Sequence, residues 1–171
     1  MNTIVNAANE LINENINWVI LGDGRRRKWL EEEIKRLKLD NKVFLLGRKS
    51  SENMPYYFAL ADALLVTLQP HPVMSAWVPG KVQSYLACGK PVIASLEGSG
   101  ADVISESGGG YIARPGDHID LANKVLKMIK CSELERNNMG ERALRFYKEN
   151  FDKSRLIDKL EKNMKALVDR T

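Results

Sequence analysis

The sequence predicts an α/β domain with a doubly wound, Rossmann-like parallel sheet of about five strands and helices on both faces. Short continuous apolar runs alternate along the 171 residues with segments of helical periodicity, which is typical of parallel strands buried on both sides. Charge is also unevenly placed. Residues 51–116 hold 3 Lys/Arg and 5 Asp/Glu, against 10 and 7 in residues 1–50 and 13 and 10 in residues 117–171. A charge-poor middle is what a buried sheet requires.

In the first half of the chain, three apolar runs predict strands at 17–21, 42–46 and 63–68. Helical spacing of apolar residues predicts helices at 3–14, 25–38 and 52–61. The first of these helices places Ile4, Ala8, Leu11 and Ile12 on one face. The last is expected to break near Pro55. Residues 69–78 hold two prolines and His71 and are expected to form a loop.

In the second half, Pro79 suits the first turn of a helix that runs to about Cys88 and stops at Gly89. Strands are expected at 91–95 and 111–113, with a short helix between them that follows Gly98-Ser99-Gly100 and stops at Gly108-Gly109-Gly110. Asp117 is the expected N-cap of a helix that buries Leu121, Val125 and Ile129. Two more helices follow, and the last, at 153–168, is expected to bury Leu156, Leu160, Met164 and Leu167.

Composition excludes several classes of protein. Hydrophobic residues make up 44% and charged residues 28%, as in a soluble globular domain. No apolar run approaches the roughly 18 residues of a membrane span, and no signal peptide is visible. Cys88 and Cys131 suit a reducing compartment and lack metal-ligand spacing, and a net charge of +4 without a motif does not indicate nucleic-acid binding. We therefore expect one cytoplasmic domain over 1–171, with no metal and no transmembrane segment.

Glycine-bearing loops follow the predicted strands, at the edge where parallel sheets bind ligands. Glycine lets backbone N–H groups approach an anion, and a helix N-terminus adds about half a positive charge. The turn Pro79-Gly80-Lys81 combines a helix start with a lysine, so it is a candidate diphosphate site, although the same residues also fit an ordinary helix start with an exposed lysine. The four loops are Gly22-Asp23-Gly24, Gly47-Arg48, Pro79-Gly80-Lys81 and Gly98-Ser99-Gly100.

Other chemistries fit the sequence less well. Gly22-x-Gly24 begins a dinucleotide fingerprint, but its third glycine would fall at Arg27 and no acidic residue ends the next strand. A P-loop and a catalytic triad are absent, and Cys88 fits an inert buried thiol. The basic cluster 25–28 is interpreted as a solvated helix start, with anion binding as the alternative.

Four segments, in this order, resemble the C-terminal, donor-binding half of glycosyltransferase family 4, a group 1 family with two Rossmann-like domains in the GT-B arrangement. The segments are WVILGDGRRRKWLEEE, VFLLGRKSSENMPYYFALADALLVTL, VPGKVQSYLACGKPVIAS and GGGYIARPGD. The resemblance covers about residues 3–165. It implies a retaining enzyme that transfers a sugar from a nucleoside diphosphate sugar, UDP-linked, in polysaccharide or glycolipid assembly, with no cofactor and no metal.

The resemblance also implies roles for individual residues. Pro79, Gly80 and Lys81 would approach the diphosphate or the sugar, and Arg48 would lie beside the base. Gly22, Asp23 and Gly24 would line the cleft, with Gly98 and Ser99 nearby. Two positions depart from the family, because Ser84 stands where the family has a ribose-binding glutamate and Ser75 or Ala76 falls near the other glutamate.

A larger departure from the family lies ahead of residue 3. The family's first strand and its acceptor domain have no counterpart here, and that strand is the central one of the sheet. Either the remaining strands close up, or a partner chain supplies the strand, and exposed edges would also allow a homo-oligomer. The resemblance also implies that the last helix, 153–168, packs toward the other domain, so part of its apolar face is expected to be exposed here. We expect a chain that is inactive alone and works with an acceptor domain or partner, at the inner face of a membrane through that partner. The alternative is a non-catalytic glycosyltransferase-like subunit or remnant that acts through protein–protein contacts.

Overall fold

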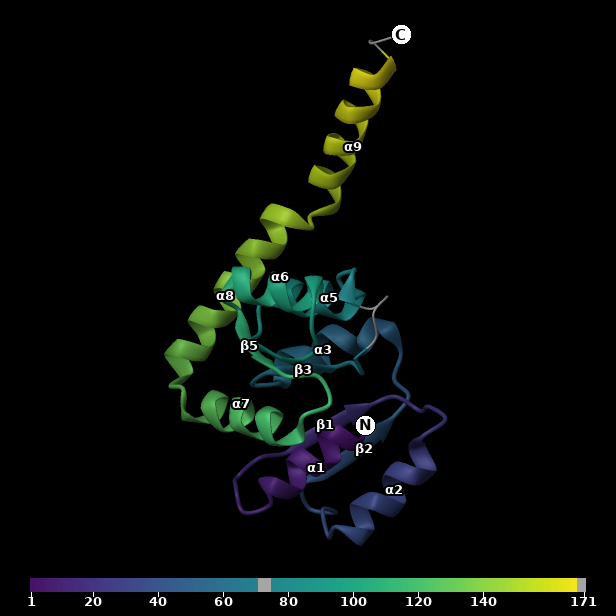
Figure 1. Cartoon of the computed structure of the whole chain (residues 1–171), viewed down its shortest axis with the longest axis vertical. Helices are drawn as coiled ribbons and strands as arrows, with labels where there is room; N and C mark the ends of the chain where they lie inside the picture. Colours follow the sequence, from purple (N-terminus) through teal and green to yellow (C-terminus); the bar gives the residue numbers. More distant parts are fainter. Residues whose placement is uncertain (71–74, 169–171) are drawn as a thin grey trace.

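Helices and strands alternate along the chain in the computed structural model, which describes residues 1–70 and 75–168 (Figure 1). The predicted elements form within a few residues of their expected bounds. Part of the predicted loop 69–78, including His71, lies outside the described residues. The elements are α1 (Asn2–Glu10), β1 (Trp18–Leu21), α2 (Arg27–Arg36), β2 (Val43–Gly47), the 3-10 helix η1 (Ser51–Asn53), α3 (Met54–Leu60), β3 (Leu64–Thr67), α5 (Gly80–Ala87), β4 (Val92–Ser95), α6 (Ser99–Ser107), β5 (Gly110–Ala113), α7 (His118–Lys130), α8 (Glu133–Asn150) and α9 (Lys153–Val168).

The five strands are parallel, but they form two sheets. β1 pairs with β2, with Trp18 opposite Val43, and β4 lies between β3 and β5, with Val92 opposite both Leu64 and Gly110. Within the described residues no strand joins β1 to β3. The sheet is therefore interrupted at the central position and the strands do not close up, which answers one of the questions that the sequence left open.

Two apolar clusters form the core. The first lies under α1, α2 and α7 and includes side chains of both sheets, among them Trp18, Val43 and Ile93. The second lies between the three-stranded sheet and α5, α6 and α8, around Leu86, Val92 and Ile104. Helices therefore cover both faces of the β3–β4–β5 sheet, as predicted.

One face of the β1–β2 sheet is not covered in this way. Trp18 and Val43 point into the first cluster, whereas Val19, Phe44 and Leu46 alternate to the other side, where Val19 is 55% exposed. The helix that follows in sequence, α3, contributes no buried residue. The predicted α/β fold with helices flanking parallel sheets is confirmed, and this face of the smaller sheet is the part that the described helices cover least.

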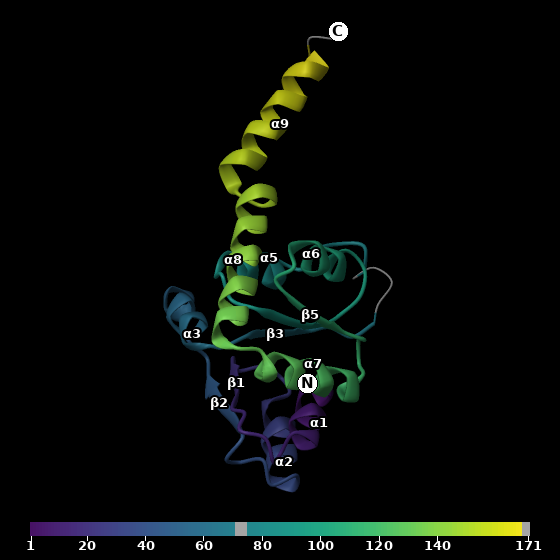
Figure 2. The same ribbon diagram turned by 90° about the vertical axis from the view of Figure 1, so that its left-hand side faces the viewer.

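The last helix contradicts the expected burial of its apolar face and agrees with the expectation, drawn from the resemblance, that part of this face is exposed. The apolar side chains predicted to be buried on α9, Leu156, Leu160, Met164 and Leu167, are 48–67% exposed, and the helix has no buried residue. Figures 1 and 2 show the reason, because α9 continues from α8 away from both sheets and meets no other element of the described chain. Its periodicity predicted the helix correctly but gave no partner for its apolar face.

On α7, one of the three residues predicted to be buried is exposed. Leu121 and Val125 are buried as predicted, but Ile129 is 41% exposed and Met128 is buried in its place. The helix turns Leu121, Val125 and Met128 toward α1, a spacing of four and then three residues that keeps all three on one face.

Asp117 caps α7, as the sequence predicted, and this cap makes stability depend on pH. Its carboxylate accepts a hydrogen bond of 2.9 Å from the backbone N–H of Asp120, which, with Arg114 nearby, lowers the pKa of Asp117 below its ordinary value of 3.8. A lowered pKa contributes stability that is complete above the ordinary pKa and is lost as the pH falls below it. We expect the melting temperature of Asp117→Asn, which keeps a capping oxygen without the charge, to fall less steeply than that of the wild type between pH 5 and pH 2. Parallel thermal melts monitored by circular dichroism check this, and equal slopes would contradict it.

Candidate functional site

The loops that follow β1 and β2 lie against each other at the carboxyl ends of these strands. Gly22 donates its N–H to the carbonyl of Gly47 at 2.8 Å, which ties the two loops together. Gly22, with φ of +130°, and Gly24 have open space where a Cβ would stand, and Asp23 is exposed between them. Arg48 is exposed directly after β2 and makes no hydrogen bond or ion pair within the described part of the chain.

Arg27 joins these two loops, which sequence reasoning did not predict. Its guanidinium donates a hydrogen bond of 2.8 Å to the carboxylate of Glu31 and lies 3.9 Å from the carboxylate of Asp23. It also packs against Gly47, since a Cβ added to Gly47 would lie 3.4 Å from Nη1 of Arg27. The signal in the sequence was the spacing, because Arg27 stands four residues before Glu31 and four residues after Asp23. One residue of the basic cluster therefore has a structural role. The interpretation of that cluster as a helix start holds, since α2 begins at Arg27.

The N-termini of α5 and α6 meet at the carboxyl ends of β3 and β4. Pro79 precedes α5 and Gly98 precedes α6, and neither helix start has a side-chain cap. The two starts are packed closely, because a Cβ on Gly100 would lie 2.9 Å from Cδ of Pro79 and one on Gly98 would overlap the carbonyl oxygen of Ser75. Their positive dipole ends therefore lie side by side.

Two site residues sit on the first turn of α5. Gly80 has open space at the position of a Cβ, and Lys81 is exposed and makes no ion pair among the described residues. The backbone N–H groups of this turn can therefore be approached from solvent, with an ammonium beside them. Two acidic residues belong to the neighbouring helix start. Glu97 is exposed just before α6, and Asp102 lies in the first turn of α6. Asp102 thus lies at a helix start, where the helix dipole favours a negative charge.

The remaining predicted residues lie close to the same turn. Ser99 is half-buried and begins α6. Ser84 is exposed one turn into α5 and donates its hydroxyl to the carbonyl of Gly80 at 3.0 Å, so its oxygen can only accept from a ligand. Cys88, four residues further, has a raised pKa because it is partly buried, which fits an inert thiol.

The structure thus assembles the predicted residues into two groups. The loops after β1 and β2 form one, and the helix starts of α5 and α6 form the other. No hydrogen bond or ion pair joins the two groups among the residues that the structure describes. They are separated at the place where the sheet is interrupted.

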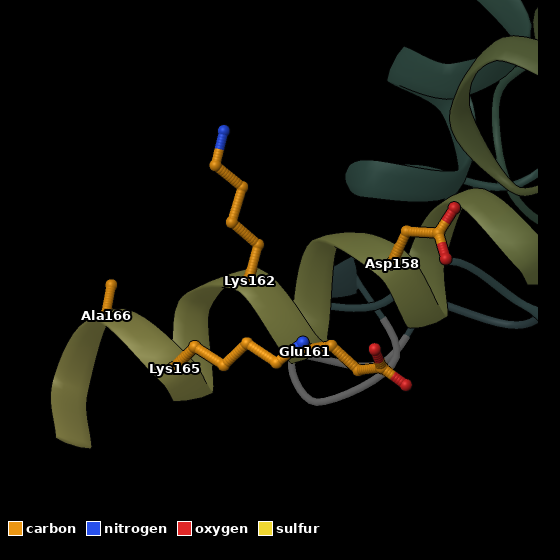
Figure 3. A pocket seen from close by; sticks show the side chains of 5 residues that line it. All are labelled: Asp158, Glu161, Lys162, Lys165 and Ala166. Atoms are coloured by element: carbon orange, nitrogen blue, oxygen red, sulfur yellow. The ribbon is translucent and has the colours of Figure 1, made fainter. Parts of the chain in front are cut away.

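A hollow of about 440 Å³ lies elsewhere, on α9 (Figure 3). All five lining residues come from one helix, so the hollow is an open surface rather than an enclosed site: Asp158, Glu161, Lys162, Lys165 and Ala166. In the described ranges, no group of three or more His, Cys, Asp and Glu side chains could hold a metal ion. No helix of the described chain is long and apolar enough to cross a bilayer.

Comparison with known proteins gives these observations a context. The sequence model of a family described as glycosyl transferases group 1 matches residues 1–146. An N-acetyl-alpha-D-glucosaminyl L-malate synthase of Bacillus anthracis is 27% identical over 143 residues, 84% of this chain and 35% of that protein. An uncharacterized glycosyltransferase of Methanocaldococcus jannaschii is 30% identical over 132 residues, 77% of this chain and 36% of that protein.

Solved structures show the same fold at lower identity. HepE of Anabaena, solved in complex with UDP, superposes with a TM-score of 0.82 at 20% identity, over 97% of this chain and 45% of that one. A glycosyltransferase of Rickettsia africae gives a TM-score of 0.83 at 20% identity, over 99% of this chain and 45% of that one. The chain therefore spans about a third of the length of these curated relatives and less than half of these structures.

Proposed function

Because the chain belongs to the glycosyl transferases group 1 family, we propose that it is the donor-binding, C-terminal half of a retaining glycosyltransferase of family 4. The complete enzyme transfers a sugar from a nucleoside diphosphate sugar to an acceptor in polysaccharide or glycolipid assembly. The bond from the sugar's C1 to the diphosphate oxygen breaks, a bond from C1 to an acceptor oxygen forms, and the acceptor's proton passes to the departing diphosphate. The departing diphosphate carries the developing negative charge, which the site must stabilise.

The pairing of two helix starts with Lys81 is the observation that carries this proposal. Both α5 and α6 begin without a side-chain cap, and Gly80 leaves the first turn of α5 open. Backbone N–H groups at a helix start suit phosphate oxygens, and the ammonium of Lys81 adds a charge-assisted contact. These groups are in place before the donor arrives, so little reorganisation is needed when charge develops.

The other candidate residues take their proposed roles from the resemblance to the family, some beside the diphosphate site and some in the separate group after β1 and β2. Ser84 lies one turn along α5, where its oxygen can accept from a ribose hydroxyl, and Gly98 and Ser99 border the phosphates from α6. In this proposal Arg48 contacts the base, and Gly22, Asp23 and Gly24 line the cleft. UDP is the proposed nucleotide, since HepE of Anabaena and TarM of Staphylococcus aureus were each solved in complex with UDP. No metal or cofactor takes part in this proposal.

The acceptor side of the reaction belongs to an acceptor domain or partner chain outside these 171 residues. The chain alone is then inactive, and it works in the cytoplasm, at the inner face of the membrane when its partner or acceptor is held there. The length of the relatives supports this, because the curated proteins carry about two thirds of their chain beyond the matched part.

Lys81→Ala tests the site. We expect the wild-type chain to bind UDP in isothermal titration calorimetry and the variant to bind it roughly tenfold to a hundredfold more weakly, since a hydrogen bond to a charged group contributes about 1.5–3 kcal/mol. Lys148→Ala, which removes an exposed lysine from α8, is the matched control and should bind UDP as the wild type does.

Gly80→Ala separates the backbone from the lysine. A Cβ at position 80 meets nothing within 4 Å, so the melting temperature should hold, while the methyl group obstructs the approach of the diphosphate and weakens UDP binding. Unchanged affinity in both Lys81→Ala and Gly80→Ala would place UDP elsewhere and contradict the proposed site.

The alternative function is a non-catalytic subunit that acts through protein contacts. The uncharged Ser84, whose hydroxyl donates to the helix backbone, is the observation that favours it. Titration with UDP, UDP-glucose, UDP-N-acetylglucosamine, ADP and GDP decides between the two. Binding of any of them that Lys81→Ala weakens supports a donor site, and binding of none supports the subunit.

A further inference from the structure

The last helix is surrounded by solvent along its whole length. Every residue of α9 (Lys153–Val168) is exposed, and α8 is the element with which it is in most contact. Both views show α9 leading away from the two sheets, beyond the end of α8 (Figures 1 and 2). The core of the domain therefore gains nothing from α9, and the surface of this helix is open to another body.

One side of α9 is apolar. Six side chains that are 44–71% exposed form a stripe along it: Leu156, Ile157, Leu160, Met164, Leu167 and Val168. Leu156, Leu160, Met164 and Leu167 follow one another at spacings of four, four and three residues, which keeps them on one face of the helix. A protein rarely leaves a continuous apolar stripe in water, so this stripe indicates a contact with something else.

The other side of α9 is basic. The helix carries five basic and two acidic side chains, which gives it a net charge of +3. None of the five basic side chains forms an ion pair with another residue that the structure describes. Figure 3 shows this side of the helix, with Lys162 extended away from the backbone into open space. The cations of α9 are therefore free to meet negative charge on another body.

α9 is too short to cross a membrane. Its 16 residues extend about 24 Å at a rise of about 1.5 Å per residue, whereas the hydrocarbon core of a bilayer is about 30 Å thick. Its charged side could not enter hydrocarbon in any case. A helix with one apolar and one basic side lies instead in the plane of the membrane surface, with its apolar side at the boundary of the acyl chains.

The charge of α9 favours a lipid surface over a protein as the body that covers the apolar stripe. Lysine is depleted where proteins contact one another, whereas the cytoplasmic surface of a membrane is rich in anionic lipid. Each Lys or Arg held near such a surface raises partitioning onto it about fivefold. Cover by another protein domain, which the resemblance to the family implied, would need acidic groups opposite the same cations.

We infer that α9 is an anchor that binds the surface of an anionic phospholipid bilayer, with Leu160 and Met164 toward the acyl chains and the basic side chains among the headgroups. The membrane contact then belongs to this chain itself and not only to a partner. This inference goes beyond the proposed function, because lipid binding by α9 needs neither UDP nor an acceptor. Where the proposed function holds, the anchor brings the donor site to the surface that holds a lipid-linked acceptor.

Co-sedimentation of the full 171-residue chain with sucrose-loaded vesicles tests the anchor. One set of vesicles is phosphatidylcholine alone, and the other contains phosphatidylcholine and phosphatidylglycerol. We expect the wild type to bind the anionic vesicles at least about tenfold more strongly than the neutral ones, since five cations face the headgroups. Most of this difference should disappear in about 1 M salt, where the Debye length falls to about 3 Å.

A first pair of double variants tests the apolar stripe. Leu160→Gln with Met164→Gln removes its centre and should weaken binding to the anionic vesicles at least about tenfold. Leu60→Gln with Leu134→Gln is the matched control, because these two leucines are at least as exposed, on α3 and α8, and it should bind as the wild type does. Since all four positions are exposed, the melting temperatures should match that of the wild type.

A second pair tests the charge. Lys162→Gln with Lys165→Gln should weaken binding to the anionic vesicles at least about tenfold and leave binding to the neutral ones unchanged. Lys28→Gln with Lys35→Gln removes the same charge from exposed positions of α2 and should bind as the wild type does. The control also tests the basic cluster 25–28, because a loss of binding in it would place the lipid contact on α2.

Four results would overturn the inference. The wild type would bind neither kind of vesicle, or either double variant of α9 would bind the anionic vesicles as the wild type does, or a control would lose as much binding as its partner variant. The fourth is a dimer in analytical ultracentrifugation that Leu160→Gln with Met164→Gln abolishes, which would assign the stripe to a second copy.

UDP titration of the same variants separates the anchor from the proposed function. All four double variants should bind UDP as the wild type does, because none of them touches the donor site. Vesicle binding by a chain that binds no UDP would retain the anchor and contradict the proposed function.

Discussion

Replacing Gly110 by alanine is expected to destabilise the chain by about 3–5 kcal/mol, a large part of the stability of a typical domain. A Cβ at this position would overlap the carbonyl oxygen of Val92, the residue opposite it on β4. Because the obstacle is backbone, it can give way only if β4 and β5 separate. Urea unfolding followed by tryptophan fluorescence measures the loss.

Gly24→Ala is the matched control for this variant. Gly24 has open space at the position of its Cβ and no positive φ, so the same substitution should leave the urea midpoint nearly unchanged. A Gly110→Ala variant as stable as Gly24→Ala would show that the β4–β5 contact is looser than the structure indicates.

Gly98→Ala is expected to disturb the candidate site itself. Gly98 has φ of +71° and ψ of −152°, a conformation that essentially only glycine adopts and that costs other residues about 1–3 kcal/mol. A Cβ there would also overlap the carbonyl oxygen of Ser75, which separates the segment before α5 from the start of α6. We expect at least a tenfold loss of UDP affinity together with a lower melting temperature.

Gly116→Ala is the control for Gly98→Ala, because it separates the effect of backbone strain from that of steric overlap. Gly116 has φ of +78° but open space at its Cβ, so Gly116→Ala suffers the backbone strain alone. It should lower the melting temperature by a smaller amount and leave UDP binding intact. Equal UDP affinity in the two variants would show that the contact between the two helix starts does not matter for the donor.

The elements of the fold could be predicted because each has a local signal. The apolar run Val92-Ile93-Ala94 is fully covered in β4, and Asp117 caps α7 through its own carboxylate. Burial on α9 could not be predicted locally, because an apolar stripe on a helix shows that a face can be buried and not what covers it. The exchange of Ile129 for Met128 in the core has a similar cause, since α1 decides which side of α7 is covered.

Only part of the candidate site could be predicted from the sequence. Glycines and a helix start led to Gly80 and Lys81, and the resemblance to a known family located the remaining residues. Contacts between distant segments gave no signal, such as Gly98 against Ser75 or Arg27 against Gly47. The interruption of the sheet could not be predicted, because the sequence of β1 or of β3 alone does not show whether the two strands pair with each other.

The packing of α1 on α7 has a consequence for the partial unfolding of the chain. Together with the apolar cluster that it covers, it is the main attachment of residues 1–47 to the elements that follow, within the ranges described. Residues 1–47 should therefore unfold as a cooperative unit at a lower free energy than the three-stranded sheet, leaving that sheet and its helices intact. A strand hydrogen-bonded to both sheets would merge the two units, so that partial opening would give way to a single global transition.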